Sequence, residues 1–124
     1  MSVIELGTKL VQLCNEGKGL EAVDTLYGEK VVSIEGQGSD AIPARMEGLQ
    51  AVRGKSVWWY DNNEVHASTA LGPFVGHRED QFVVQFDLDT TPKSTGVRGQ
   101  MREVGLYTVE DGKIVQEEFL YLMG

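Results

Sequence analysis

The chain has 124 residues, of which 41% are hydrophobic, and a formal net charge of −8. This length and apolar content predict one globular domain with one core. The negative charge argues against phosphate-rich partners, so neither nucleic acid nor an anionic membrane surface is expected to bind. The sequence has no apolar run of membrane-spanning length and no basic-then-apolar leader, and Cys14 cannot form an internal disulfide. These features favour a cytoplasmic protein.

The first half of the chain shows helical periodicity. Ser2-Val3-Ile4-Glu5 is a capping-box pattern that predicts a helix start, and Gly17 ends the apolar repeat that follows it. A second, short helix is predicted over 20–27. A third is predicted over 48–60, although Gly54 in its middle costs about 1 kcal/mol relative to alanine.

The other segments are typical of β-strands. A short strand over 31–35 separates the second and third helices, and longer strands are predicted over 64–71, over 81–88 and on both sides of Asp111-Gly112, between Gly99 and Met123. Polar loops are predicted over 36–46 and 90–98. Helices that precede a run of strands predict an α+β fold, with three helices packed on one face of a strongly curved, mostly antiparallel sheet.

The register of the last hairpin decides which side chains face the interior. A three-residue loop with Gly112 in the left-handed bulge position would place Val109 opposite Lys113. Counting outward, the facing pairs on one side of the sheet are then Tyr107 and Val115, Gly105 and Glu117, Glu103 and Phe119, and Met101 and Tyr121. A two-residue Asp-Gly turn is the alternative, and it would turn Glu118 inward in place of Glu117.

In the first of these registers, Glu103 and Glu117 lie among apolar and aromatic side chains. A buried carboxylate without a cationic partner is unfavourable and titrates abnormally. We therefore predict a ligand site on this face, where like-charge repulsion keeps one of the two carboxyls protonated. In the alternative arrangement, one of the two faces solvent.

Three segments carry a resemblance to a known family: Lys30-Val31-Val32-Ser33-Ile34-Glu35, Gly48-Leu49-Gln50-Ala51-Val52-Arg53-Gly54 and Tyr107-Thr108-Val109-Glu110-Asp111-Gly112-Lys113-Ile114-Val115. In their order along the chain they resemble the SnoaL-like polyketide cyclases and ketosteroid isomerases of the nuclear transport factor 2-like superfamily. The resemblance covers nearly the whole chain and implies a cone-shaped single domain over 1–124. This scaffold hosts enzymes, ligand binders and protein-interaction modules.

The resemblance also implies a catalytic role for Glu35, which occupies the place of the general base in ketosteroid isomerase-like members. A desolvated carboxylate with little cationic compensation would be a better base near neutral pH than a solvated one. The tyrosine and the acid that stabilise the enolate in those enzymes correspond here to Leu10 and Gly105, which have no hydrogen-bonding side chain. Glu103 could take the place of the acid that is missing at Gly105 only if the ligand binds in a different position from that in those enzymes.

Other side chains are candidates for the cavity wall. Because adjacent helical residues cannot face the same way, Trp59 rather than Trp58 is expected inward. His66 is either a cavity acid, base or donor, or a partly exposed strand residue. No cofactor is expected, and no metal site, because His66 and His77 lack supporting ligand spacing. The predicted ligand-binding residues are Tyr27, Trp59, His66, Glu103, Tyr107, Glu117, Phe119 and Tyr121.

The leading functional hypothesis is a protein that binds a small hydrophobic carbonyl compound in an apolar cavity and transfers a proton without a cofactor, in an isomerisation, cyclisation or dehydration. The alternatives are a non-catalytic ligand-binding module and a dimeric protein-interaction module. A homodimer is expected through the outer sheet face, where Val104 and Leu106 pair with Leu120 beside Arg102 and Thr108.

Overall fold

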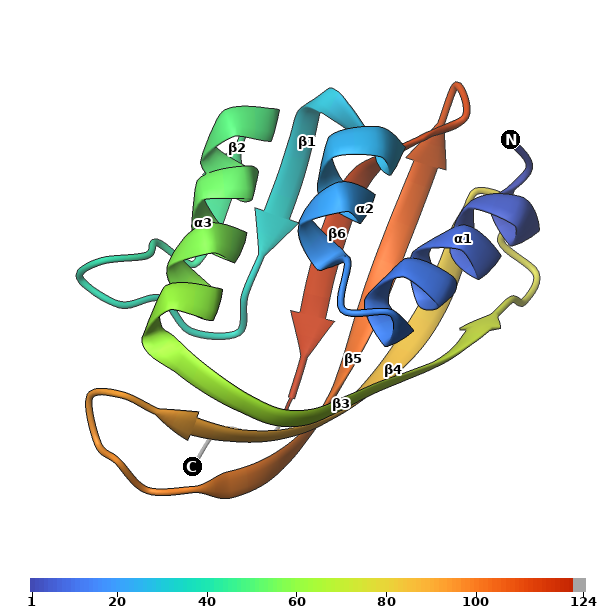
Figure 1. Ribbon diagram of the computed structural model, residues 1–124. Helices are drawn as coiled ribbons and strands as arrows, with labels where there is room; N and C mark the ends of the chain where they lie inside the picture. The colour runs from blue at the N-terminus through green and yellow to red at the C-terminus, as the bar shows by residue number, and fades with distance from the viewer. Residues whose placement is uncertain (122–124) are drawn as a thin grey trace.

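The computed structural model describes residues 1–121. Its elements are α1 (Val3–Asn15), α2 (Gly19–Leu26), β1 (Tyr27–Ile34), β2 (Arg45–Glu47), α3 (Leu49–Asn62), β3 (Asn63–Phe74), β4 (Gln81–Pro92), β5 (Gly99–Glu110) and β6 (Lys113–Leu120). Three helices pack on one face of a curved six-stranded sheet (Figure 1), which confirms the predicted α+β fold. The strand order is β2-β1-β6-β5-β4-β3, and only β1 and β6 run parallel. No helix within this range is long and apolar enough to cross a membrane.

Helix α1 begins at the predicted capping box. The backbone N–H of Glu5 donates to Ser2 Oγ at 3.1 Å, and the backbone N–H of Ser2 donates to Glu5 Oε1 at 3.3 Å. Two of the N–H groups that a helix start leaves unpaired are thereby satisfied. The apolar stripe that follows packs against the sheet, since Leu6 and Leu10 are buried.

The core lies between the helices and the inner face of the sheet. Phe82, Val84 and Phe86 alternate along β4 and are all buried, as their period-two pattern predicts. The Tyr107 ring on β5 stacks on the Phe82 ring with 5.0 Å between the ring centroids. Phe119 on β6 packs against the same core. The aromatic side chains of three adjacent strands therefore form the floor of the cone.

The turn between β5 and β6 differs from the predicted three-residue loop. Asp111 and Gly112 both have positive φ, 52° and 73°, and Glu110 pairs with Lys113 across them. This is a two-residue turn, whose twist suits a β-hairpin. The predicted pairing of Val109 with Lys113 is therefore wrong.

A register shift one step further along the hairpin reverses the effect of that turn. Val109 pairs with Ile114, but Thr108 pairs with Gln116, so Val115 is an extra residue in β6. Beyond this bulge Tyr107 faces Glu117, and Gly105 faces Phe119. The predicted partners are thus displaced by two residues along β6, and an even displacement keeps every side chain on its predicted face. The predicted continuation of this strand to Met123 lies outside the described residues.

Strand β2 is an addition to the predicted elements. Its first two residues lie at the end of the segment 36–46, which was predicted to be a loop, and the strand pairs antiparallel with β1. Such a short strand has too few residues to show a periodicity. Just before it, Ala44 O accepts a hydrogen bond from the Glu35 N–H at 2.7 Å, which fixes the end of β1 and the residue that follows it.

Candidate functional site

Polar side chains gather inside the cone, where the end of β1 faces the middle of α3. They form what we call the interior polar cluster, whose members are Tyr27, Ser33, Glu35, Lys55, Glu103 and Glu117. Four of the six were predicted site residues, contributed by β1, β5 and β6 and by the residue that follows β1. The structure thus brings together groups that lie up to 90 positions apart in the chain.

Lys55 reaches from α3 to two partners on the inner side of β1. Its Nζ lies 2.5 Å from Glu35 Oε1 and donates to Ser33 Oγ at 2.7 Å. The two side chains of the ion pair are 13% and 20% exposed, so the pair is largely shielded from solvent. The predicted lack of cationic compensation at Glu35 is therefore wrong.

Glu117 is the most deeply buried carboxyl of the cluster, at 5% exposure. The Tyr27 hydroxyl donates to one of its oxygens, and Ser33 Oγ donates to the other at 2.6 Å. Burial raises the pKa of Glu117, while the hydrogen bonds from Ser33 and Tyr27 and the charge of Lys55 offset part of the rise. Glu117 faces inward and Glu118 pairs on the outer side, which settles the choice between the two.

Glu103 is the other interior carboxyl, on β5. Burial raises its pKa to about 7; the nearby charges of Glu35 and Glu117 add to the rise, and Lys55 opposes it. Within residues 1–121, the Glu103 carboxyl forms no ion pair. Burial is the main cause of this rise, whereas the prediction assigned it to repulsion between Glu103 and Glu117, which contributes less.

The predicted aromatic residues surround this cluster at different depths. Tyr107 is buried in the core, and the Phe119 ring lies below the Lys55 ammonium, 5.0 Å from Nζ to the ring centroid. Tyr121 stands at the rim, where burial and then the charge of Glu35 raise the pKa of its hydroxyl. Trp59 is half-buried on α3 and its neighbour Trp58 is exposed, which matches the predicted orientation.

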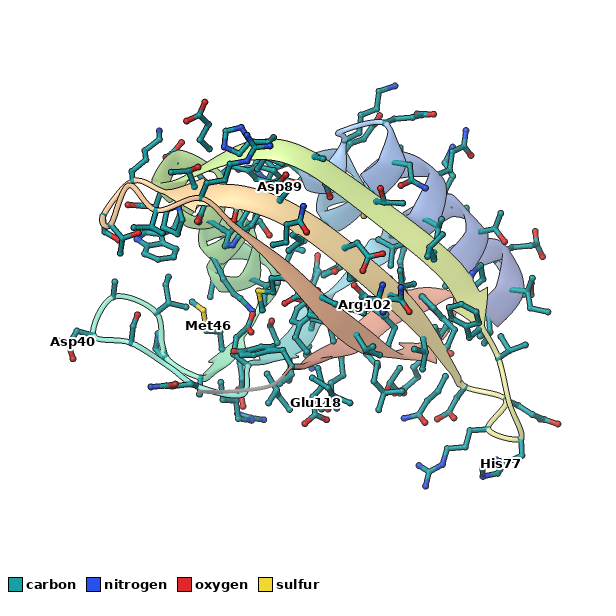
Figure 2. All side chains as sticks on the ribbon, turned by 90° about the horizontal axis from the view of Figure 1, so that it is seen from below. Asp40, Met46, His77, Asp89, Arg102 and Glu118 are labelled. Atoms are coloured by element: carbon teal, nitrogen blue, oxygen red, sulfur yellow. The ribbon has the colours of Figure 1, made fainter. Side chains whose placement is uncertain are left out.

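Neither histidine joins the cluster. His66 is exposed on β3, and its Nε2 lies 2.8 Å from Thr91 Oγ1. His77 lies on the hairpin between β3 and β4, at the opposite end of the molecule from the loop that carries Asp40 (Figure 2). No group of three His, Cys, Asp or Glu side chains within the described range is arranged to hold a metal ion.

The interior was expected to be an apolar cavity, but one end of it is polar. Two shallow surface depressions of about 300 and 320 Å³ lie beside α1, and Ile4 lines both. Neither is lined by a residue of the interior polar cluster. Hydrogen bonds and one ion pair connect the cluster members other than Glu103, and the Glu35 side chain is 20% exposed at the rim.

Sequence reasoning missed Lys55 and Ser33, although both carry a periodic signal. Lys55 follows the buried Val52 by three positions and precedes Trp59 by four, so it lies on the inward stripe of α3. Ser33 lies between Val31 and Glu35 at strand alternation. A charged residue on a stripe that should be apolar is the signal that could have identified the ion pair.

Gly105 is closely covered by a neighbouring side chain. A Cβ at this position would lie 2.7 Å from Tyr107 Cε2 and 3.1 Å from the Tyr107 hydroxyl oxygen. The Tyr107 ring therefore occupies the space into which any side chain at position 105 would project. Leu10 is buried in the core, so neither of the two positions at which the sequence resemblance predicts enolate-stabilising groups carries a hydrogen-bonding side chain.

This architecture, a curved sheet that wraps around three helices with titratable groups inside the cone, is that of the nuclear transport factor 2-like class. The model of the SnoaL-like domain matches residues 1–121. The chain therefore belongs to the SnoaL-like domain family. No curated protein matched the chain.

Solved structures agree with this assignment. A Mesorhizobium loti protein, provisionally named a SnoaL-like polyketide cyclase and carbohydrate phosphatase, is 39% identical with a TM-score of 0.90, over 98% of this chain and 100% of its own. A provisionally named isomerase from Bacillus subtilis is 19% identical with a TM-score of 0.74, over 98% and 90%. A Xanthomonas campestris protein with a cystatin-like fold is 15% identical with a TM-score of 0.78, over 99% and 92%. The last two are similar to this chain in fold alone.

Proposed function

We propose that this protein binds a small, largely hydrophobic carbonyl compound at the interior polar cluster and catalyses a cofactor-free proton transfer. The observation that carries the proposal is the presence of two carboxyl groups in different environments. Glu35 is paired with an ammonium, whereas Glu103 is half-buried, forms no ion pair within residues 1–121, and has its pKa raised by burial to about 7. Two carboxyl groups whose environments differ in this way can serve as base and acid at the same pH.

Each group has a defined role in this proposal. The Glu35 carboxylate removes a proton from the carbon next to the carbonyl, and Glu103 returns or donates one. Phe119 and Trp59 supply apolar and aromatic contact surface for the ligand. Isomerisation, intramolecular aldol cyclisation and dehydration all proceed through such a step, and the names of two similar structures, a polyketide cyclase and an isomerase, fall in these classes.

A non-catalytic ligand-binding module is the second candidate. It is favoured by the absence of a hydrogen-bonding side chain at Leu10 and Gly105, and by surface depressions that lie away from the cluster. Catalysis and binding differ in whether a proton leaves carbon, so a measurement of proton exchange separates them.

We also propose that the protein is a cytoplasmic homodimer that pairs through the outer sheet face. Figure 2 looks onto this face, with Asp89, Arg102 and Glu118 labelled along it. Leu120 on β6 is 52% exposed, and it pairs with Val104 on β5. Leu120 and Val104 form an apolar strip on this face. Ion pairs flank the strip, such as the one between Arg102 Nε and Asp87 Oδ1 at 2.7 Å. A strip with a charged border suits a sheet-to-sheet contact.

The test of catalysis does not require the natural substrate. A panel of small cyclic and acyclic ketones is incubated with the protein in deuterated water, and NMR follows deuterium uptake at the carbon next to the carbonyl. We expect accelerated uptake in at least one ketone, and a rate at least ~10²-fold lower for Glu35→Gln. Glu29→Gln, on an exposed position of β1, is the matched control and is expected to keep the rate. If the ketones bind but none exchanges, the non-catalytic module replaces the proposal.

A further inference from the structure

The Lys55 ammonium is the cation of the interior polar cluster, and it retains bonding capacity. It has three N–H donors. Within residues 1–121 its polar partners are Ser33 Oγ at 2.7 Å and Glu35 Oε1 at 2.5 Å. One N–H therefore remains for a third oxygen, and the Lys55 side chain is 13% exposed.

A proton transfer from carbon to Glu35 moves negative charge away from this carboxylate. The C–H electron pair becomes the new C=C bond of an enolate, and the carbonyl π pair moves onto oxygen. Glu35 becomes neutral as the substrate oxygen becomes anionic, so the total charge of the site stays constant. Lys55 thus loses its anionic partner in the same step in which an anion forms on the substrate.

On the basis of the proposed function, we infer that Lys55 is a catalytic residue whose ion pair passes from the Glu35 carboxylate to the developing enolate oxygen. An interaction that is stronger in the transition state than in the ground state is the kind that accelerates a reaction. The inference also narrows the substrate class to compounds whose carbonyl oxygen can reach Nζ while the adjacent C–H faces Glu35.

Two further residues hold the ammonium in place. Ser33 is fully buried, accepts from Lys55 Nζ and donates to Glu117 at 2.6 Å. Glu117 is in turn held by the Tyr27 hydroxyl. The donor is therefore oriented before the reaction, which is what makes such a group effective in a water-poor site. Ser33 and Glu117 are positioning residues in this scheme.

The probe for this role is 4-nitrophenol. Its phenolate resembles an enolate, because both place the charge on an oxygen attached to a planar carbon framework, and its visible absorbance reports the ionised form directly. We expect the wild-type protein to bind the phenolate and Lys55→Met to bind it at least ~10-fold more weakly. Lys55→Arg keeps the charge and is expected to retain binding. Lys30→Met, at an exposed position of β1, makes the same change in net charge and should bind as the wild type does.

Several results would overturn the role of Lys55. One is equal phenolate binding by the wild type and a folded Lys55→Met, and another is no phenolate binding by the wild type. If Lys55→Met does not fold, the double variant Lys55→Met/Glu35→Gln, which removes both members of the ion pair, is compared with Glu35→Gln alone. A purely structural lysine would alter stability in these variants but not the ionised fraction of the bound phenol.

The deuterium-exchange experiment tests the proposed function and the phenolate experiment tests the role of Lys55, so a negative result in one can be told from a negative result in the other. Catalysed exchange without Lys55-dependent phenolate binding supports the proposed function and removes this inference. Lys55-dependent phenolate binding without exchange in any ketone overturns the proposed function and, with it, the catalytic role.

Discussion

Replacing Glu103 by glutamine should change the pH dependence of stability. The folded protein holds the Glu103 proton more tightly than the unfolded chain does, because burial raises the pKa from 4.5 to about 7. The stabilising contribution of this proton is complete below about pH 4.5 and is lost as the pH rises through about 7. Glutamine keeps the shape and stays neutral, so Glu103→Gln should not suffer this loss.

The magnitude follows from the same two pKa values. Each pKa unit corresponds to about 1.4 kcal/mol, so ionising Glu103 costs the folded state at most about 3 kcal/mol. The carboxyl forms no ion pair within the described range, so glutamine breaks no salt bridge and loses only the attraction of the nearby Lys55 charge. We therefore expect Glu103→Gln and the wild type to be nearly equally stable at about pH 4.5, and the variant to be more stable by up to about 3 kcal/mol at about pH 8.

Urea unfolding at a series of pH values measures this difference. In thermal unfolding near pH 8, the melting temperatures of the variant and the wild type should differ on the order of 10 °C. Glu118→Gln is the matched control, because it makes the same chemical change on the outer face of the sheet. A stability difference between Glu103→Gln and the wild type that stays constant from about pH 4.5 to pH 8 would refute the reasoning, since it would mean that burial does not shift this titration.

Three further predictions concern other parts of the molecule. Gly54→Ala should raise the free energy of unfolding by about 0.5–1 kcal/mol in a urea titration, because a Cβ there meets open space on α3; a loss of stability would contradict this. Tyr27→Phe should lower it by about 1–3 kcal/mol, since the variant removes a donor from the buried Glu117 carboxyl, and an unchanged unfolding midpoint would argue against that bond. Light scattering at micromolar concentration should give twice the 13.7 kDa chain mass, and Leu120→Asp should shift it to the monomer; a monomeric wild type rules out the sheet-face dimer.

Patterns within a few residues of one another were enough to predict most of the fold. The capping box at Ser2 and the alternation of Phe82, Val84 and Phe86 both survive in the structure, since each depends on neighbours in the same helix or strand. Family resemblance supplied the cone shape and the place of Glu35. The three-residue strand β2 was missed because it is too short to show a period.

The register of the last hairpin is a feature that such local patterns do not determine. Asp111-Gly112 marks the turn, but the sequence does not distinguish a two-residue turn from a three-residue bulged loop, and nothing in it marks Val115 as an extra residue. The turn and the bulge each reverse the faces of β6, and together they return Glu117 to the interior. Packing of Phe119 against the core favours this combination, because the turn without the bulge would place Phe119 on the outer face of β6.

The chemistry of the site depends on contacts between distant segments. Glu35 and Lys55 are 20 positions apart, and no spacing rule connects the residue after a strand with the middle of a later helix. The pKa of Glu103 depends on burial and on charges contributed by β6, α3 and the end of β1. Residue types and their periodicity could therefore identify candidate inward carboxylates, but not choose between Glu117 and Glu118. Whether each is paired, neutral or free to exchange a proton depends on solvent exclusion and on distances of a few ångströms, which exist only once the chain has folded.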